Sequence, residues 1–520
     1  MFSFPWWLSL LIGFLSLSVE ILWVRVAGFA FQTMPFAFSF VLACYLAGIA
    51  CGAAYGKRLC ARAPDLYAAA AIVLALAALG DALTPLIITH FLARAGAYNL
   101  EAFAIVIVVV AGLKSVLFPI AHHLGAVAQG ARVGRSVSRI YFGNIIGATL
   151  GPLVTGFIAL DYLNTDECFA LSGAACLLIS LACVLKSGRR LYVAVPLAAA
   201  VVIALCAGQV ARPGPGSLGV LTVSDPRALT HFIANRHGVI HTASTAAGDF
   251  VFGNNVYDGI ATVDVDANPN RLDRLYLLAV LQPHPRRVLA IGLSAGAWVR
   301  AVQGFPGVER IDVVEINPAY VDLIRAYPEI APLLNDPRVH IHIDDGRRWL
   351  KRNPAEHFDL IIQNTSYYWR ANTGNLLSRE YFTEVQRHLN PGGIFTANTT
   401  GSFDVLATAQ AVFLYVYRYA NFVYACDLPA APDFNRLASV QRPDGALFAA
   451  GMVPTNSVAG ILTSARLESA AGFIKRRGAD AQVITDDNLL SEYRHGLRYG
   501  PALLLKVLPP AAAEFGINDP

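Results

Sequence analysis

The segment Arg287-Val-Leu-Ala-Ile-Gly-Leu-Ser-Ala-Gly296 decides the fold of the C-terminal half of this chain. Its largely apolar part from Arg287 to Gly292 predicts a buried parallel strand, because strands covered on both faces read as nearly continuous hydrophobic runs. Gly292 and Gly296 flank Ser294 in a tight turn that opens a helix, which brings backbone N–H groups and a helix N-terminus near a ligand. Because a glycine pair alone is a weak signal, its weight depends on the strands that follow.

Three further strands are predicted at 310–315, 339–343 and 358–363, and a polar group follows or ends each one. Open α/β sheets bind ligands at the carboxyl ends of their strands, and an acid about 20 residues after a glycine turn can accept both hydroxyls of a ribose. Taken singly, Glu315 or Asp344 fits a helix cap or a solvated turn equally well. Together the strand ends predict a nucleoside site that comprises Gly292, Ser294, Gly296, Glu315, Asp344, Asp345, Gly346 and Asn364.

The N-terminal part is apolar. The chain has 55% hydrophobic and 15% charged residues, whereas soluble proteins have about 25% charged residues. A helix needs about 20 apolar residues to cross a bilayer. Segments of this kind run through Trp6–Ala27, Phe36–Tyr55, Leu66–Phe91, Ala102–Ile120, Tyr141–Leu160, Phe169–Leu185 and Leu191–Gly208. The sequence therefore predicts an α-helical polytopic membrane bundle of about seven spans, with the lipid bilayer as its partner.

Composition divides the chain into three parts. We expect a transmembrane helical domain at 1–210, a linker and small β region at 211–285, and a soluble α/β Rossmann-like domain at 286–520. Pro213-Gly-Pro-Gly216 marks the linker. The first apolar segment is interpreted as a retained helix, because it lacks the basic start of a signal peptide and contains Glu20 and Arg25.

Basic loops predict the orientation of the bundle. Clusters of Lys and Arg follow the second, fourth and sixth segments: Lys57, Arg58, Arg62; Arg132, Arg135, Arg139; and Lys186, Arg189, Arg190. Such loops stay in the cytoplasm. With seven spans the soluble domain would be extracytoplasmic, away from a cytosolic nucleoside cofactor. Either the nucleoside interpretation fails, or one segment does not cross, and the short segment Leu191–Gly208 is the candidate.

Two classes of function find no support in the composition. The net charge is only +4, and no long basic run with interleaved aromatics occurs, so we expect no nucleic-acid partner. Seven of the eight cysteines fall in or beside the apolar half, which leaves Cys426 alone in the soluble half. This distribution excludes a disulfide framework and a Cys-rich zinc site there, and no metal site is expected.

The region from Asp258 to about Ser402 resembles the spermidine synthase (polyamine aminopropyltransferase) family. The resemblance is carried by Ile291-Gly-Leu-Ser-Ala-Gly296, Val314-Glu-Ile316, Asp336-Pro-Arg338, Asp344-Asp-Gly346 and Leu389-Asn-Pro-Gly-Gly393. Asp486-Asp487-Asn488 is similar to the Thr-Asp-Asp signature of many membrane-fused members. Segments 20–25, 48–58 and 141–147 are similar to the N-terminal polytopic transmembrane region of that membrane-fused branch.

This resemblance implies a fold of the adenosylmethionine-dependent methyltransferase type and S-adenosylmethionine or decarboxylated S-adenosylmethionine as cofactor. It places Glu315 on the ribose and Asp344–Asp345 beside the adenine. Three positions depart from the family, which has carboxylates where this chain has Ala295, Asn364 and Tyr367. An amide cannot act as a general base near neutral pH, and a polyamine would lose its anionic partners. Authentic spermidine synthesis is therefore not expected, and the catalytic residues remain unassigned.

Segment 364–370, with its aromatics, hydroxyls and Arg370, suits an aromatic-cage or anionic ligand better, unless the aromatics simply pack under a loop. Two functions stay open. The first is a membrane-anchored group transferase that acts on a small-molecule substrate in a bacterial inner (plasma) membrane. The second is a transporter or sensor with a non-catalytic nucleoside-binding regulatory domain. Glu20 and Asp81 are the candidate functional groups inside the bundle, where ionisable side chains are costly.

Overall fold

The computed structural model describes residues 3–95, 99–129, 133–210, 214–364, 367–448 and 454–492. It divides into two compact units. The helical unit comprises Met1–Gln32, Phe36–Thr222 and Phe232–Val239, and the α/β unit comprises Thr33–Pro35, Val223–His231 and Ile240–Pro520. Arg132, Thr365 and Ser366, which the sequence interpretation used, lie outside the described residues.

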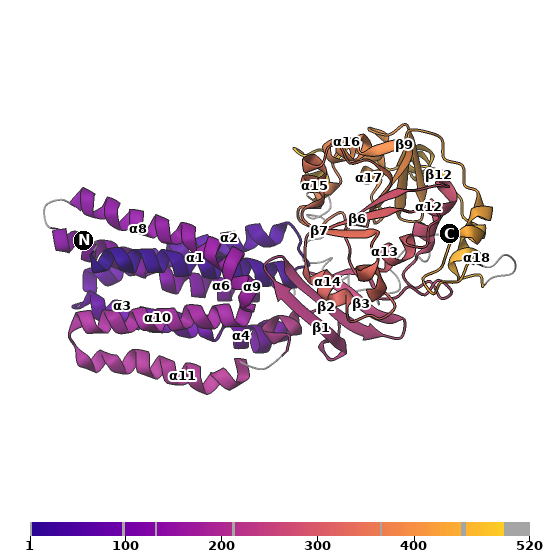
Figure 1. Cartoon of the computed structure of the whole chain (residues 1–520). Helices are drawn as coiled ribbons and strands as arrows, with labels where there is room; N and C mark the ends of the chain where they lie inside the picture. The colour runs from indigo at the N-terminus through magenta and orange to yellow at the C-terminus, as the bar shows by residue number, and fades with distance from the viewer. Residues whose placement is uncertain are drawn as a thin grey trace. The chain divides into compact units, whose positions relative to one another are not determined.

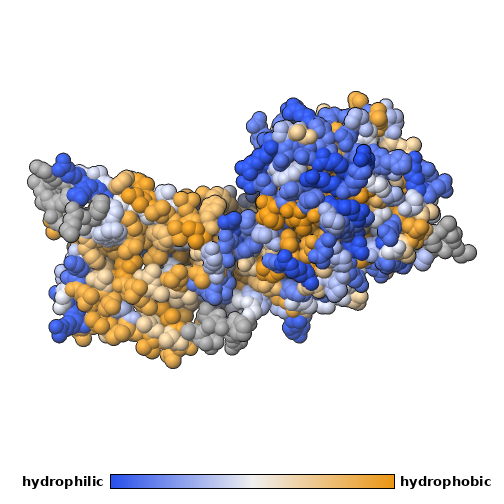
Figure 2. Space-filling model, in the orientation of Figure 1, coloured by the Kyte–Doolittle hydropathy of each residue, from blue (hydrophilic) through white to orange (hydrophobic). Residues whose placement is uncertain are grey.

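The helical unit is built from long apolar helices (Figure 1). Their bounds are α1 Phe4–Ala30, α2 Phe36–Arg62, α3 Leu66–Ala82, α4 Thr84–Ile87, α5 Ala93–Ala95, α6 Leu100–Ser115, α7 Leu117–Gln129, α8 Val133–Val154, α9 Leu160–Tyr162, α10 Thr165–Ser187 and α11 Ala194–Val210, with π-helical turns at Ile88–Leu92 and Thr155–Ala159 and a 3-10 turn at Arg190–Val193. Hydrophobic side chains cover much of the visible face of these helices (Figure 2). Within the helical unit, the side chains of Leu46, Phe157 and Leu178 are each more than half exposed.

Five helices in the described residues are long and apolar enough to cross a membrane: Phe4–Ala30, Phe36–Arg62, Leu100–Val127, Val137–Tyr162 and Thr165–Ser187. The third predicted segment differs, because it breaks into Leu66–Ala82 and Thr84–Leu92 with a bend of 50°. Pro85 stands in the first turn after the break, where the chain needs no intrahelical N–H. The seventh predicted segment is a shorter apolar helix at Arg190–Cys206. By length and composition, the described residues thus contain five candidate spans, or six with the bent pair, where the sequence predicts about seven.

Glycines let neighbouring helices of this unit touch. A Cβ added at Gly147 of α8 would lie 1.9 Å from the Leu10 oxygen of α1, and one at Gly151 would lie 2.3 Å from the Phe14 oxygen. On α2, a Cβ at Gly52 would lie 2.2 Å from the Gly112 oxygen of α6. These separations are too short for any side chain, so the small-residue positions fix the packing of α1 on α8 and of α2 on α6.

An ion pair lies inside the helical unit. The ammonium of Lys114 on α6 lies 2.5 Å from Asp81 Oδ1 on α3, and both side chains are at most 2% exposed. The Ser172 hydroxyl of α10 donates to Asp81 Oδ2 at 2.7 Å. Asp81 therefore ties three helices together, whereas no such partner is recorded for Glu20 among the described residues.

Two sheets follow the helices in sequence. The first is antiparallel, with strands β1 Leu229–Asn235, β2 Gly238–Thr245, β3 Gly248–Gly253 and β4 Val256–Ile260 in that order. The second has eight strands in the order β12-β10-β11-β9-β8-β5-β6-β7. Its strands are β5 Arg287–Ile291, β6 Arg310–Glu315, β7 Val339–Ile343, β8 Phe358–Gln363, β9 Leu389–Asn398, β10 Tyr415–Tyr419, β11 Phe422–Cys426 and β12 Glu468–Ser469.

The eight-stranded sheet is a Rossmann-like sheet of the methyltransferase type. Strands β7, β6, β5, β8 and β9 are parallel, whereas β11 runs antiparallel between β9 and β10. Its helices include α12 Asp273–Leu281, α13 Ala297–Val302, α14 Ala319–Ile324, α15 Gly346–Arg352, α16 Arg379–Arg387, α17 Phe403–Gln410, α18 Val458–Thr463 and α19 Ala470–Arg477. Strand order reverses between β5 and β8, and open α/β sheets bind ligands at the carboxyl ends of the strands beside such a reversal.

Candidate functional site

The loop after β5 has the left-handed backbone that its glycines allow. Gly292, Ser294 and Gly296 have φ angles of 92°, 48° and 78°. A Cβ at Gly296 would lie 2.7 Å from the Ile324 side chain, so this glycine also lets the loop pack against α14. The turn that the sequence predicted is therefore confirmed, and its Ser294 hydroxyl donates to the Asp258 carbonyl oxygen at 2.6 Å.

Glu315 ends β6 directly beside this loop, and its side chain is only 4% exposed. The Leu293 N–H donates to Oε2 at 2.7 Å, and the Asn317 N–H donates to Oε1 at 2.8 Å. Burial raises the pKa of this carboxyl to about 7, although the two N–H groups act to lower it. A carboxylate can accept about four hydrogen bonds. Each oxygen of Glu315 therefore keeps one acceptor position, a pair that matches two neighbouring hydroxyls.

The acids after β7 have structural partners. Asp345 is the N-cap of α15, and its carboxylate accepts the Arg348 N–H at 2.8 Å. Asp344 forms ion pairs with Arg348 and Arg352. Partial burial acts to raise the pKa of Asp344, but the hydrogen bonds from Arg348 and from the Asp345 N–H and the charges of Arg348 and Arg352 together keep that pKa below the ordinary value. Asp345 therefore acts as a helix cap, whereas Asp344 is a charged group at the edge of the sheet.

The residues after β8 lack an acid. The side-chain oxygen Oδ1 of Asn364 accepts a hydrogen bond from the Asn398 side-chain amide at 3.3 Å. The Tyr367 ring stacks on Trp369 with centroids 5.3 Å apart and planes 26° apart. Ala295, the third departure from the family, is 3% exposed and offers only a methyl group. At these three positions the chain has no group that could accept a proton from an amine.

The sequence analysis missed a carboxylate near the glycine loop. Asp258 of β4 accepts a hydrogen bond from the Tyr320 hydroxyl of α14, with 2.5 Å between the oxygens. Burial raises the pKa of Asp258, whereas Tyr320 and the nearby Arg370 guanidinium act to lower it. Asp258 and Tyr320 are 62 residues apart, so no local pattern links them. The one available signal was the position of Asp258 at the start of the family resemblance.

Arg370 is not a free cation for an anionic ligand. Its guanidinium donates to the Gly253 carbonyl oxygen at 3.3 Å and faces the charge of Asp258. The glycine loop and Glu315 come together as predicted, and the Asp344 N–H donates to the Glu315 carbonyl oxygen at 3.1 Å. Gly346 and Asn364 also lie at the end of β5, because a Cβ at Gly346 would lie 2.6 Å from the Ile291 side chain and one at Gly292 would lie 3.9 Å from the Asn364 backbone oxygen. The structure adds Asp258 and Tyr320 beside the glycine loop.

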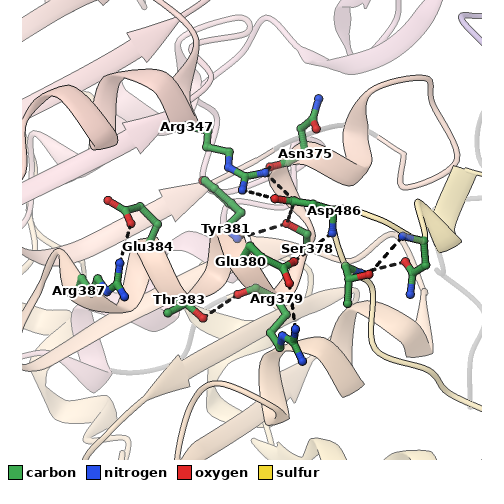
Figure 3. A network of polar contacts seen from close by, with 12 residues as sticks. Arg347, Asn375, Ser378, Arg379, Glu380, Tyr381, Thr383, Glu384, Arg387 and Asp486 are labelled. Carbon is green, nitrogen blue, oxygen red and sulfur yellow. Dashed lines mark hydrogen bonds and ion pairs between the residues drawn. The ribbon is translucent and has the colours of Figure 1, made fainter.

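Asp486, from the C-terminal motif, holds the end of the described chain against α15 and α16 (Figure 3). Its carboxylate accepts from Arg347 at 2.6 and 2.7 Å and from the Ser378 hydroxyl at 2.6 Å. Its own N–H donates to Glu380 at 3.0 Å. Because Arg347 lies in the first turn of α15, this network supports the turn that carries Asp345.

Comparisons with known proteins give matches to the C-terminal part of the chain. Residues 277–423 match the family described as spermine/spermidine synthase domain, so the C-terminal part contains a spermidine synthase domain. Over 145 residues, 28% of this chain, it is 31% identical to putrescine N-methyltransferase 2 from Nicotiana attenuata and to spermidine synthase 1 from Hyoscyamus niger. The chain spans 36% and 42% of the lengths of these two relatives.

A solved spermidine synthase in complex with the transition state analogue AdoDATO is 18% identical, with a TM-score of 0.34. The alignment covers 41% of this chain and 77% of that structure. The fold assignment rests on the strand order and directions of the eight-stranded sheet.

Proposed function

We propose that this chain, whose C-terminal part contains a spermidine synthase domain, is a membrane-anchored transferase that uses S-adenosylmethionine or its decarboxylated form. The observation that carries the proposal is Glu315, a buried carboxylate with one unused acceptor position on each oxygen beside a glycine loop. Two ribose hydroxyls would occupy both positions. The methyltransferase-type sheet puts this carboxylate where open α/β folds bind nucleosides.

The acceptor side differs from a polyamine site. Asn364 cannot take a proton near neutral pH, and neither Ala295 nor Tyr367 supplies the negative charge with which a carboxylate pairs with an ammonium group. We assign acceptor deprotonation to Asp258, whose raised pKa suits proton transfer closer to neutrality. The relatives carry the names putrescine N-methyltransferase and spermidine synthase. Both a methyl and an aminopropyl group are therefore candidates for the transferred group, and the acceptor is a small molecule other than a polyamine.

Membrane anchoring is the second part of the proposal. The apolar helices and their exposed hydrophobic side chains support insertion in a bacterial inner membrane. The basic residues at the C-terminal ends of α2 and α10 support a cytoplasmic position for those ends. Reporter fusions after Lys186 and after Arg212 test the short helix α11. A periplasm-active enzyme after Arg212 works only if α11 crosses, and it is silent at both fusions if α11 does not cross. Activity of the fusion after Lys186 would contradict the cytoplasmic position of that loop.

A transporter or sensor with a non-catalytic nucleoside-binding domain is the second candidate. The amide of Asn364, at the position of the family's general base, is the observation that favours it. The two candidates agree on cofactor binding and differ on turnover.

The experiment uses the full chain, purified in detergent, with each adenosyl compound and a small-molecule extract. Methyl transfer releases S-adenosylhomocysteine, and aminopropyl transfer releases methylthioadenosine, so the coproduct identifies the reaction before the acceptor is known. We expect one coproduct, which Asp258→Asn lowers at least tenfold without weakening adenosyl binding. Binding without either coproduct would favour the sensor. The absence of binding would contradict both candidates.

A further inference from the structure

An apolar groove lies on the helical unit. It has a volume of about 520 Å³ and is bordered by α2, α3 and α6. Tyr55, Ile72, Leu76 and Val109 line it, and their side chains are between 38% and 56% exposed. No charged side chain contributes to its lining. A groove of this size is within the range of about 300–1,000 Å³ typical of small-molecule sites.

The groove follows from the glycines of α2. Cβ atoms added at Gly48, Gly52 and Gly56 would lie 2.2–2.6 Å from carbonyl oxygens of the helix pair α6–α7. This contact brings the α2 backbone onto α6, where larger residues would hold the helices apart. Gly52 and Gly112 themselves line the groove, so its floor is nearly bare backbone. The floor and the apolar walls leave room for a flexible hydrocarbon chain.

One end of the groove is basic. Cys51 and Tyr55 line it, and Arg58 and Arg62 continue the same stripe of α2 at spacings of three and four residues. At a rise of 1.5 Å per residue, Arg58 lies about 4.5 Å and Arg62 about 10 Å beyond Tyr55 along the helix axis. Both arginines are exposed, and within the described part of the chain no ion pair is recorded for either.

We propose that this groove binds one lipid with an anionic phosphate head group, its acyl chain along the apolar walls and its phosphate on Arg58 and Arg62. The inference rests on the membrane location proposed above. An apolar patch next to unpaired basic residues on one helix face complements both halves of such a lipid. Guanidinium groups also bind phosphate oxygens in a bidentate manner. A zwitterionic lipid fills the same groove but gains less from the two arginines.

The test measures which lipid stays on the protein. The full chain in detergent is equilibrated with equal amounts of phosphatidylglycerol and phosphatidylcholine with identical acyl chains, and retained lipid is counted by native mass spectrometry. We expect at least a fivefold preference for phosphatidylglycerol, since one basic residue near a membrane surface contributes about fivefold. Arg58→Glu with Arg62→Glu should abolish the preference, whereas Arg58→Lys should keep most of it.

Two further variants locate the lipid. Ala69→Trp places a large ring in the groove and should lower retention of both lipids. Arg135→Glu with Arg139→Glu reverses two exposed charges of α8, away from the groove lining, and should leave the preference unchanged. An unchanged preference in the Arg58/Arg62 variant, equal loss in the α8 variant, or unaltered retention with Ala69→Trp would overturn the proposal. Adenosyl binding, measured on the same samples, reports separately on the proposed function.

Discussion

The pH dependence of cofactor binding is the prediction that the structure makes most specific. Glu315 has to be ionised to accept two ribose hydroxyls, because each of its oxygens already accepts one backbone N–H. Burial raises its pKa to about 7. Lowering the pH through 7 therefore removes the form that binds the nucleoside.

The size of the effect follows from the pKa. With a pKa of about 7, roughly nine in ten carboxyls are ionised at pH 8 and roughly one in ten at pH 6. Affinity for an adenosyl compound should fall about tenfold between these pH values. Glu315→Gln keeps the shape but turns an NH2 group toward one of the two N–H donors. This variant should bind about tenfold to a hundredfold more weakly at pH 8, and its affinity should not change with pH.

The assay is calorimetric titration of the full chain with S-adenosylmethionine and its decarboxylated form at pH 6, 7 and 8. Glu309→Gln is the matched control, because Glu309 lies just before β6 but is exposed and paired with Arg286. It should keep both the affinity and the pH dependence of the wild type. A pH-independent wild type, or a Glu315→Gln variant with full affinity at pH 8, would refute the ribose assignment.

Without a ligand, pH should act on folding stability in the opposite direction from its effect on affinity: the contribution of Glu315 to stability should fall as the pH rises. Because the folded pKa of about 7 exceeds the ordinary 4.5, the folded state holds the Glu315 proton more tightly than the unfolded state between these values. The contribution of Glu315 to stability is thus full below 4.5 and falls by about 3 kcal/mol as pH rises to 7. Denaturant unfolding of wild type and Glu315→Gln across this range measures it, and identical pH slopes would contradict the raised pKa.

Three further predictions concern packing, the buried ion pair and the product. Gly296→Ala should destabilise the chain by about 1–3 kcal/mol more than Gly401→Ala in denaturant unfolding, since both glycines have positive φ but only the Cβ at Gly296 meets neighbours; equal losses would contradict the crowding argument. Lys114→Met should lower the free energy of unfolding by about 3–5 kcal/mol, because it leaves the buried Asp81 without its cationic partner. The double variant Asp81→Leu with Lys114→Met should recover most of this loss in thermal unfolding. A double variant as unstable as Lys114→Met would contradict the importance of the ion pair. Purified chain supplied with putrescine and decarboxylated S-adenosylmethionine should form no spermidine by mass spectrometry, and robust formation would show that the missing carboxylates are dispensable.

Local sequence patterns were enough to predict the parallel strands of the α/β unit. β6, β7 and β8 have the predicted bounds, and β5 ends one residue earlier, at Ile291. Buried parallel strands are nearly continuous apolar runs that end in turn residues, so both their interior and their ends are encoded locally. The close approach of Glu315 to the glycine loop could also be predicted from the sequence, because neighbouring parallel strands end at the same edge of a sheet.

Interactions between segments far apart in the chain could not be predicted from the sequence. The Asp258–Tyr320 hydrogen bond joins two different parts of the α/β unit, and Asp486 reaches Arg347 across 139 residues. Asp345 could have been a ligand or a cap, and only its bond to the Arg348 N–H identifies the cap. In the bundle, hydropathy detected the third segment but not its 50° bend, because the direction of a helix after a break depends on packing.

The central claim is that the glycine loop and Glu315 form a site for an adenosyl compound. The most direct measurement is a titration of the purified full chain at pH 8 with S-adenosylmethionine, decarboxylated S-adenosylmethionine and methylthioadenosine. The account predicts saturable binding of at least one of them, with one site per chain and competition among those that bind. Absence of saturable binding by all three, in a sample whose unfolding transition shows it to be folded, would contradict it.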